Sequence, residues 1–381
     1  MHPPGATHLV ALLQRTQRHI RIMDSGIDIF LNTNVGLPMK LFLLFSVTAL
    51  AAIAIVPAGA LGADDPANLG GWQKITAAVK RGVTLVEKSA RSYPTHRKCF
   101  ACHHQTLPLL ALGEARKAGV KTDETLPGEI VEFTATAFRG KIDDLNAGDN
   151  IGGKGLTVGY GLWALRLAQR QPDDLSQALA TYLIKTQAED GHWDLHSIRP
   201  PAEESLVMCT VLAAYGLKSA LGEAQREAAA AAVDKSRQWL ASAKLESHED
   251  KIARLWGCRL LDSGEDELAA AQKGVLDMQR SDGGWGQTSE MESDAYATGT
   301  AVFVLLDAGL AAANPQVQLA IEFLLTTQLD DGSWLVTTRA KPVQVYFDNG
   351  DPHGTSQFIS TSATCWSVAA LARAINGVPL P

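Results

Sequence analysis

The sequence predicts an all-α protein whose helices pair into hairpins and pack as two concentric layers. Two observations predict this fold: a short motif recurs along the chain, and apolar helical runs alternate with amphipathic ones. The composition agrees, because 46% of the 381 residues are hydrophobic and 20% are charged, which is enough apolar material for a large core.

A Q-x-x-D-G-x-W motif occurs three times. The copies are QAEDGHW at residues 187–193, QRSDGGW at 279–285 and QLDDGSW at 328–334. They begin 92 and 49 residues apart, and because 92 is nearly twice the shorter spacing, we expect a degenerate unit between the first two. In each copy a helical pattern ends at the Gln, and the Asp-Gly pair makes a turn.

Helical runs of two kinds alternate along the chain. Small, apolar runs are expected at 103–119, 157–169, 205–217, 253–261, 294–310 and 362–374. More polar runs precede them, near 73–90, 125–139, 174–187, 224–242, 266–280 and 315–328. A helix that is apolar nearly all round is buried, whereas a helix with a polar stripe faces water. Six inner helices, parallel to one another, with six outer ones wrapped around them make an α/α toroid (an α6/α6 barrel).

The motif residues are expected to have a structural role in this fold. Each Gln amide can satisfy backbone groups at a helix end and tie that helix to its neighbour. Each Trp can cover the same cap while it buries a large apolar area. We therefore interpret the motif as a signature of the fold and not of a reaction.

The three copies resemble the QW motifs of the squalene-hopene cyclase and prenyltransferase superfamily. The resemblance covers most of residues 70–380 and implies the toroid. Terpene cyclases of that superfamily carry two toroids, whereas this chain is long enough for one. Protein prenyltransferases use one toroid and a zinc ion held by Asp, His and the Cys of a D-x-C motif, which this sequence lacks. The resemblance predicts a single-toroid member and leaves the activity open.

The resemblance also points to a candidate acid. The cyclases use the middle Asp of a D-x-D-D-T-A motif, at the start of an inner helix, as proton donor. The nearest counterpart here is ESDAYA at 292–297, which keeps a carboxylate at Asp294 but lacks the third Asp and the Thr. Asp294 is therefore a candidate catalytic acid, with helix capping as the alternative role.

The amino-terminal segment predicts export. Residues 39–60 contain a Met-Lys start, an apolar run at 41–56 and an A-x-A-like cleavage site at 58–60. This run is shorter than the roughly 20 residues of a membrane-spanning helix. We expect a cleaved signal peptide and a periplasmic protein, with an uncleaved membrane anchor as the alternative. Residues 1–38 are then an upstream extension from a mis-assigned start, and 61–381 form a single toroid domain.

The segment KCFACHHQ at residues 98–105 contains the C-x-x-C-H pattern that attaches a c-type haem. In such a site Cys99 and Cys102 form thioethers to the haem vinyl groups, and His103 binds the iron. Attachment takes place outside the cytoplasm, where a signal peptide directs the chain. The alternatives are a Cys99–Cys102 disulfide or a zinc site, and the zinc site lacks a second pair of ligands. We expect one covalent haem c at the start of the first inner helix.

No motif identifies the sixth ligand of the iron. Met291 and His353 are the candidates, and His96 and Met208 are further ones. A second protein ligand is typical of an electron-transfer centre, whereas an open position permits a small molecule to bind.

The loops that follow the Asp-Gly turns should gather with the haem motif at one end of the toroid. The loop after Trp334 is longer than the roughly 12 to 15 residues at which structureless loops are typically functional. The candidate residues at this mouth are Glu204, Asp294, Tyr296, Arg339, Tyr346 and His353. An apolar opening with such a rim would suit oxidation or reduction of a hydrophobic molecule.

Three functions follow from these patterns. The first is a haem-dependent redox protein that exchanges electrons with a partner protein or with a hydrophobic, isoprenoid-like molecule. The second is a haem-free repeat protein that binds a hydrophobic ligand or a protein. The third is a degenerate terpene cyclase with Asp294 as general acid. The net charge of −7 argues against a nucleic-acid partner, and peripheral membrane contact is compatible with export.

Overall fold

The computed structural model describes residues 66–196, 199–219, 225–342 and 345–376. The chain divides into two units, 1–63 and 64–381, and all the described residues belong to the second. They form thirteen α-helices and two short 3-10 helices and contain no β-strand. The prediction of an all-α protein is confirmed for this part of the chain. The predicted upstream extension and signal peptide lie outside the described residues.

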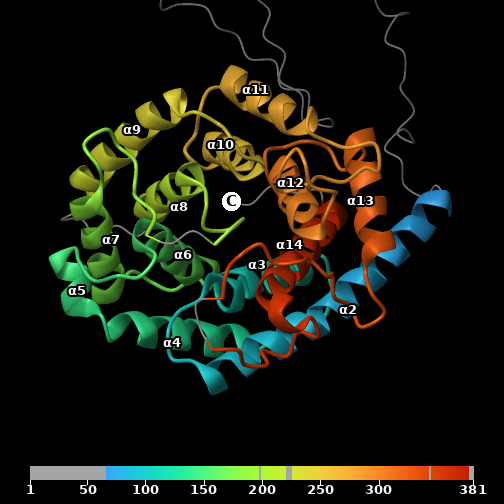
Figure 1. The fold of residues 1–381 in the computed structure, drawn as a ribbon, viewed down its shortest axis with the longest axis horizontal. Coiled ribbons are helices and arrows are strands. Elements are labelled where there is room, and N and C mark those ends of the chain that lie inside the picture. The colour runs from blue at the N-terminus through green and yellow to red at the C-terminus, as the bar shows by residue number, and fades with distance from the viewer. Residues whose placement is uncertain (1–65, 197–198, 220–224, 343–344, 377–381) are drawn as a thin grey trace, which may run out of the picture. The chain divides into compact units, whose positions relative to one another are not determined.

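The apolar runs form six helices that lie inside the others (Figure 1). They are α3 (Thr106–Lys117), α6 (Lys154–Leu167), α8 (Leu206–Ser219), α10 (His248–Leu260), α12 (Ala295–Asp307) and α14 (Gln357–Asn376). Each inner helix packs against the next along the chain, and α14 also packs against α3. The cycle of contacts between inner helices is therefore closed.

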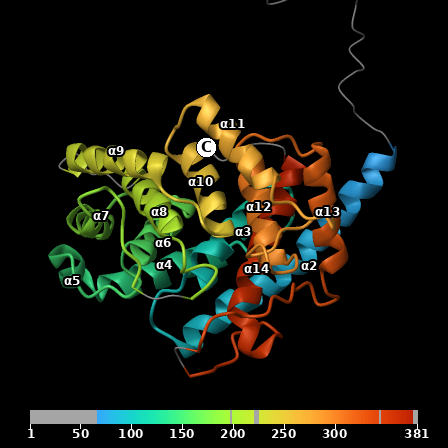
Figure 2. The same ribbon diagram turned by 45° about the horizontal axis from the view of Figure 1, so that its top comes forward.

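The more polar runs form the helices around them. These are α2 (Pro66–His96), α4 (Leu126–Arg139), α7 (Asp174–Thr186), α9 (Arg226–Ser242), α11 (Glu265–Leu276) and α13 (Pro315–Thr327), with a short α5 (Ile142–Ala147) that was not predicted. Figures 1 and 2 both show the first of them, α2, beside the last inner helix, α14, and these two helices are in contact. The first and last hairpins of the described chain are thus neighbours.

Small residues let the inner helices approach closely. Every residue of α12 is buried. A Cβ added to Gly159 would lie 2.8 Å from the backbone nitrogen of Ala213, and one added to Gly299 would lie 2.9 Å from that of Ser367.

Residues 354–376 are the one helical stretch in the described chain that is long and apolar enough to cross a membrane, and 89% of its apolar window is buried inside the protein.

The three motif copies make the same hydrogen bonds. Nε2 of Gln187, Gln279 and Gln328 donates to the carbonyl of the glycine in its own turn, at 2.9, 2.8 and 3.1 Å. The same nitrogen donates to a carbonyl of another outer helix, at 2.8, 2.7 and 3.0 Å; these carbonyls belong to Ala232, Gln316 and Ala78. Each Trp indole donates at 2.9 Å to a carbonyl ten residues earlier. The expected structural role of the motif is confirmed.

The glycine of the motif is required by both conformation and space. Gly332 has φ +88°, in the left-handed region that favours glycine, and a Cβ there would lie 2.5 Å from the backbone carbonyl of Arg81. Gly191 and Gly283 have φ of +106° and +86° and equally close neighbours. Each turn therefore lies directly against another outer helix.

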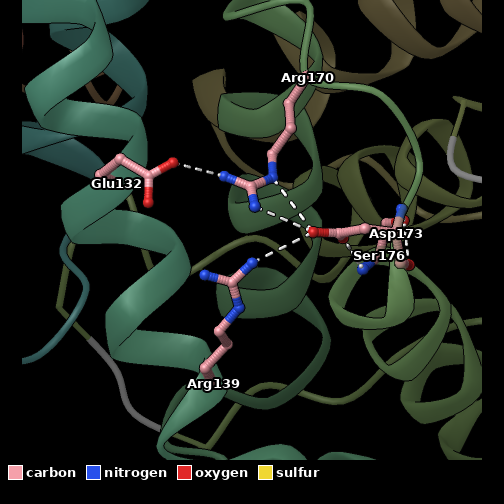
Figure 3. Close-up of polar contacts among 5 residues, drawn as sticks. All are labelled: Glu132, Arg139, Arg170, Asp173 and Ser176. Atoms are coloured by element: carbon pink, nitrogen blue, oxygen red, sulfur yellow. Dashed lines mark hydrogen bonds and ion pairs between the residues drawn. The ribbon is translucent and has the colours of Figure 1, made fainter.

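Polar contacts join α4 to the start of α7 (Figure 3). Asp173 caps α7, because its Oδ1 accepts from the Ser176 backbone nitrogen at 3.1 Å. Arg170 lies between the two helices and donates to Glu132 at 2.8 Å and to the other oxygen of Asp173, Oδ2, at 3.0 Å. Arg139 reaches the same Asp173 oxygen at 3.4 Å. These contacts fix the spacing of two neighbouring outer helices.

A buried ionic cluster joins the carboxyl-terminal halves of four inner helices. Arg373 of α14 donates to Glu114 of α3 at 3.1 Å and to Asp307 of α12 at 2.5 Å. The Trp256 indole of α10 donates to Asp307 at 3.3 Å. All three ionic side chains are at most 2% exposed. The cluster holds the inner helices together at the end away from the C-x-x-C-H segment.

Candidate functional site

An apolar cavity of about 430 Å³ lies beside the C-x-x-C-H segment, at the amino-terminal ends of the inner helices. Cys102 and His103 line it together with Tyr160 and Tyr296, and Arg199 and Lys341 are among its other lining residues. Loops after Trp193 and Trp334 supply part of the wall, as expected for the mouth. A larger, more polar cavity of about 540 Å³ against residues 148–155 contains no residue of the C-x-x-C-H segment.

The two thiols of the segment have different surroundings. Cys102 begins the 3-10 helix η1 (Cys102–His104) and lines the cavity, and burial raises its pKa to about 12. Cys99 is exposed, and its Sγ lies 3.3 Å from the Tyr93 hydroxyl. Neither cysteine is in a disulfide. The other three cysteines, Cys209, Cys258 and Cys365, are buried and free.

A hydrogen-bond chain assigns the proton positions on His103 and His104. The Asp351 backbone nitrogen donates to Oδ1 of Asn349 at 2.9 Å, so Nδ2 of that amide faces His104 and donates to its Nε2 at 2.8 Å. His104 therefore carries its proton on Nδ1, which contacts Nδ1 of His103. His103 must accept there, and in the neutral ring its proton is on Nε2.

Both imidazoles are held neutral. Burial lowers the pKa of His103 to about 3, and the positive charge of Arg199 acts in the same direction. Burial likewise lowers the pKa of His104, which is fully buried. The His103 ring packs against Phe358 with 5.0 Å between centroids, and His104 stacks on Tyr93 at 4.5 Å. A neutral imidazole is the form that binds a metal.

Three of the predicted mouth residues lie in one polar chain. Arg339 donates to Glu204 and to Gln287, each at 2.8 Å. Gln287 in turn donates to Oδ2 of Asp294 at 2.8 Å. The other oxygen of Asp294 accepts from the Ala297 backbone nitrogen at 2.9 Å and so caps α12. Burial raises the pKa of Asp294. Both oxygens of this candidate acid are thus engaged within the protein.

A fourth predicted residue, Tyr296, lines the cavity and leads to a group that the sequence did not single out. Its hydroxyl donates to Oε1 of Glu249 at 3.3 Å. Glu249 is only 2% exposed, and its Oε2 has no hydrogen-bond partner among the described residues. Burial raises the pKa of Glu249 to about 8, and the nearby Glu204 adds to the shift. The carboxyl is therefore protonated at neutral pH.

The candidates for a sixth iron ligand do not line the cavity. His353 donates from Nε2 to the Ser333 hydroxyl at 2.8 Å, because that hydroxyl donates its own proton to Asp331 at 2.6 Å. Met291 lies half-buried in the loop before α12. Of the other two candidates, His96 stacks on Phe347 and Met208 is buried in α8. Tyr346, which was predicted only as a mouth residue, does line the cavity, and 56% of its surface is exposed.

The residues around the cavity fit a covalent haem in donor type. The set comprises two free thiols, one of them at the cavity wall, and a neutral imidazole beside it. Lys341 is a cation of the kind that pairs with carboxylates such as the two on a haem, whereas Arg199 already pairs with Glu203, another lining residue. A volume of about 430 Å³ lies in the usual range of ligand pockets. Iron binding through Nε2 of His103 would need the other neutral tautomer, in which the proton moves from Nε2 to Nδ1 and is donated to Nδ1 of His104, the reverse of the hydrogen-bond direction assigned above.

No cluster of protein side chains sufficient to hold a metal ion is present in the part of the chain that the structure describes, the C-x-x-C-H segment included. Groups of three or more His, Cys, Asp or Glu side chains arranged to hold a metal ion do not occur there. The second thiol pair that a zinc site at the C-x-x-C-H segment would need is also missing from the sequence.

Comparison with known proteins gives little further information. No protein-family model and no curated protein matches the chain. Among solved structures, a protein from Actinoplanes is similar to it, with a TM-score of 0.47 and 16% sequence identity over 79% of this chain and 99% of that one.

Proposed function

We propose that this protein is a haem c-bearing redox protein built on an α/α toroid of the squalene cyclase and prenyltransferase type. The closed cycle of inner helix contacts and the shared motif hydrogen bonds support the toroid and the superfamily. In the proposed site, Cys99 and Cys102 hold the haem and His103 binds its iron. The bound haem would supply one-electron chemistry, exchanged with a partner protein or with a hydrophobic molecule in the cavity.

One observation carries this proposal: Cys102 and His103 line the same apolar cavity. A C-x-x-C-H segment inside packed protein would leave no space for a flat macrocycle next to the imidazole. Here the imidazole is neutral, half-buried and supported through His104 and Asn349. A ligating histidine is oriented by the hydrogen bond that its other ring nitrogen donates, so in the haem-bound form Nδ1 of His103 would donate to His104.

Export is part of the proposal, because c-type haem is attached outside the cytoplasm. The segment that would direct export, residues 39–60, lies outside the described residues. We propose a periplasmic location on the sequence pattern alone.

A second candidate function is a haem-free protein that binds a hydrophobic ligand in the cavity. It is favoured by the position of Cys99, whose sulfur lies against the Tyr93 hydroxyl and does not line the cavity. A cyclase role for Asp294 has less support, because both of its oxygens accept hydrogen bonds within the protein.

A spectroscopic experiment separates the two candidates. The full chain, produced in a host that matures c-type cytochromes, should give the pyridine haemochrome band of a c-type haem. The Cys99→Ala/Cys102→Ala double variant should lose this band, because no thioether can form. The matched control Cys209→Ala removes a buried thiol of α8 and should keep it. A wild-type protein that matures and folds without the band would leave only the ligand-binding candidate.

A further inference from the structure

We infer that the cavity binds an apolar molecule carrying a hydrogen-bond-accepting oxygen, such as a quinone or another carbonyl compound, and that Tyr296, backed by Glu249, is the donor to that oxygen. The inference rests on the proposed ligand-binding role of the cavity. It does not depend on the haem.

The position of the pair is the first argument. Tyr296 lines the cavity and is 2% exposed, while Glu249 does not line it and lies behind the phenol at 3.3 Å. A buried carboxyl oxygen without a partner is costly unless something else uses it, and Oε2 of Glu249 is such an atom among the described residues. The phenol is the one polar group of this pair that lines the cavity, so a ligand there meets the pair through Tyr296.

The number of protons that Tyr296 and Glu249 share decides whether the phenol can donate to a ligand. The neutral pair holds two acidic protons, one on the phenol and one on the carboxyl, and the hydrogen bond between them uses one. In the structure the phenol donates to Oε1 of Glu249. When the protonated carboxyl instead donates to the phenol oxygen, the phenol proton is free to point into the cavity. When Glu249 is ionised, the pair keeps a single proton, and the phenol must donate it to the carboxylate. Tyr296 then offers only lone pairs to a ligand.

The charged surroundings set the pH at which this change occurs. The groups that face Glu249 are Tyr296 on α12, Tyr160 on α6, Glu204 before α8, Asp250 on its own helix and Arg339 after Trp334. Burial, Glu204 and Asp250 favour the protonated acid, whereas the phenol hydrogen bond and Arg339 favour the carboxylate, and the resulting pKa is about 8. The donor is therefore present below about pH 8 and is lost as the pH rises through that value.

The lining explains why the ligand should otherwise be apolar. Leu107, Phe358 and Ile359 form part of the wall, and Cys102 and His103 are uncharged. A hydrocarbon of the right size gains from burial there, and an acceptor oxygen gains one hydrogen bond in addition.

Two matched probes test the inference on the purified full chain: duroquinone, whose fully substituted ring resists addition of thiols, and durene, the same ring without oxygens. Binding is measured by equilibrium dialysis at about pH 6 and about pH 10, on either side of the pKa of about 8. Because durene is the more hydrophobic compound, the informative quantity is the ratio of the duroquinone affinity to the durene affinity. We expect this ratio to be roughly fivefold higher at the lower pH than at the higher pH, the value of one neutral hydrogen bond.

Three variants complete the test. Tyr296→Phe should show the lower affinity ratio at both pH values. Glu249→Gln keeps a neutral donor behind the phenol, so the higher ratio should persist at the higher pH. Tyr182→Phe, which changes a phenol of α7 outside this cavity, should behave as wild type. A wild-type ratio that does not change with pH, or a Tyr296→Phe ratio equal to that of the wild-type chain at the lower pH, overturns the inference and leaves the ligand-binding role intact. If the wild-type chain binds neither probe, that role fails as well.

Discussion

Replacing Arg373 with Met should lower the free energy of unfolding by about 3–5 kcal/mol. The side chain is 1% exposed and binds two carboxylates, on Glu114 and Asp307, that are just as buried. Its guanidinium carbon also lies 4.6 Å from the centre of the Phe303 ring. Because Met fills similar space without charge, the loss measures the cost of leaving two buried carboxylates without the cation that bridges them. Chemical denaturation followed by circular dichroism gives the value.

A triple variant separates charge from packing. Glu114→Leu and Asp307→Leu, added to Arg373→Met, remove the carboxylates along with the cation, so most of the lost stability should return. If the triple variant is no more stable than Arg373→Met alone, the cluster acts through the shape of its side chains and the ionic account is wrong.

Trp334→Ala should cost a similar amount, about 3–5 kcal/mol, because it removes a large core side chain. Trp334 is 1% exposed and donates from its indole nitrogen to the Leu324 carbonyl at 2.9 Å. Its ring lies 3.5 Å from where a Cβ on Gly82 would be, so it packs against α2, the first outer helix. The loss should weaken the contact between the first and last hairpins.

Trp239→Ala is the matched control. Trp239 is half-buried on α9 and stacks on His192 with 5.3 Å between ring centroids. Its removal should cost about 1 kcal/mol, the typical value for a single substitution. Similar losses in the free energy of unfolding for the two variants would mean that the motif Trp contributes no more to stability than a half-buried Trp outside the motif.

The order and type of the long helices could be predicted because the sequence repeats. The Gln and Trp of the motif recur with one geometry, and the apolar runs are too uniformly apolar to face water. The residues at which helices begin were harder to predict. The run expected from residue 253 begins at His248, since its first turn is polar yet buried and is fixed by a capping box from Ser247. The short helix α5 was not predicted because its sequence contains no apolar run.

The site could be predicted only where a motif marks it. The C-x-x-C-H segment led to Cys102 and His103, which line one cavity, but it gave no indication that His104 and Asn349 support the imidazole across 245 residues. Glu249 was missed for a physical reason. An acidic residue in the first turn of a helix is normally exposed and interacts with the helix dipole, and the sequence does not reveal that this one is buried.

The arrangement of Arg339 with Glu204 and Asp294 could be anticipated in part. These three residues were assigned to one mouth because they lie in the loops that follow the three Asp-Gly turns. Their connection through Gln287 depends on loop conformation, which has no periodicity to read.

Intact-mass spectrometry of the mature protein under denaturing conditions tests the central claim most directly. A haem held by two thioethers survives acid and organic solvent, so the mass should exceed that of the processed chain by one haem, and the peptide containing Cys99 and Cys102 should carry it. A mature chain at its unmodified mass, with both thiols free to alkylate, would contradict the assignment of a haem c to this protein.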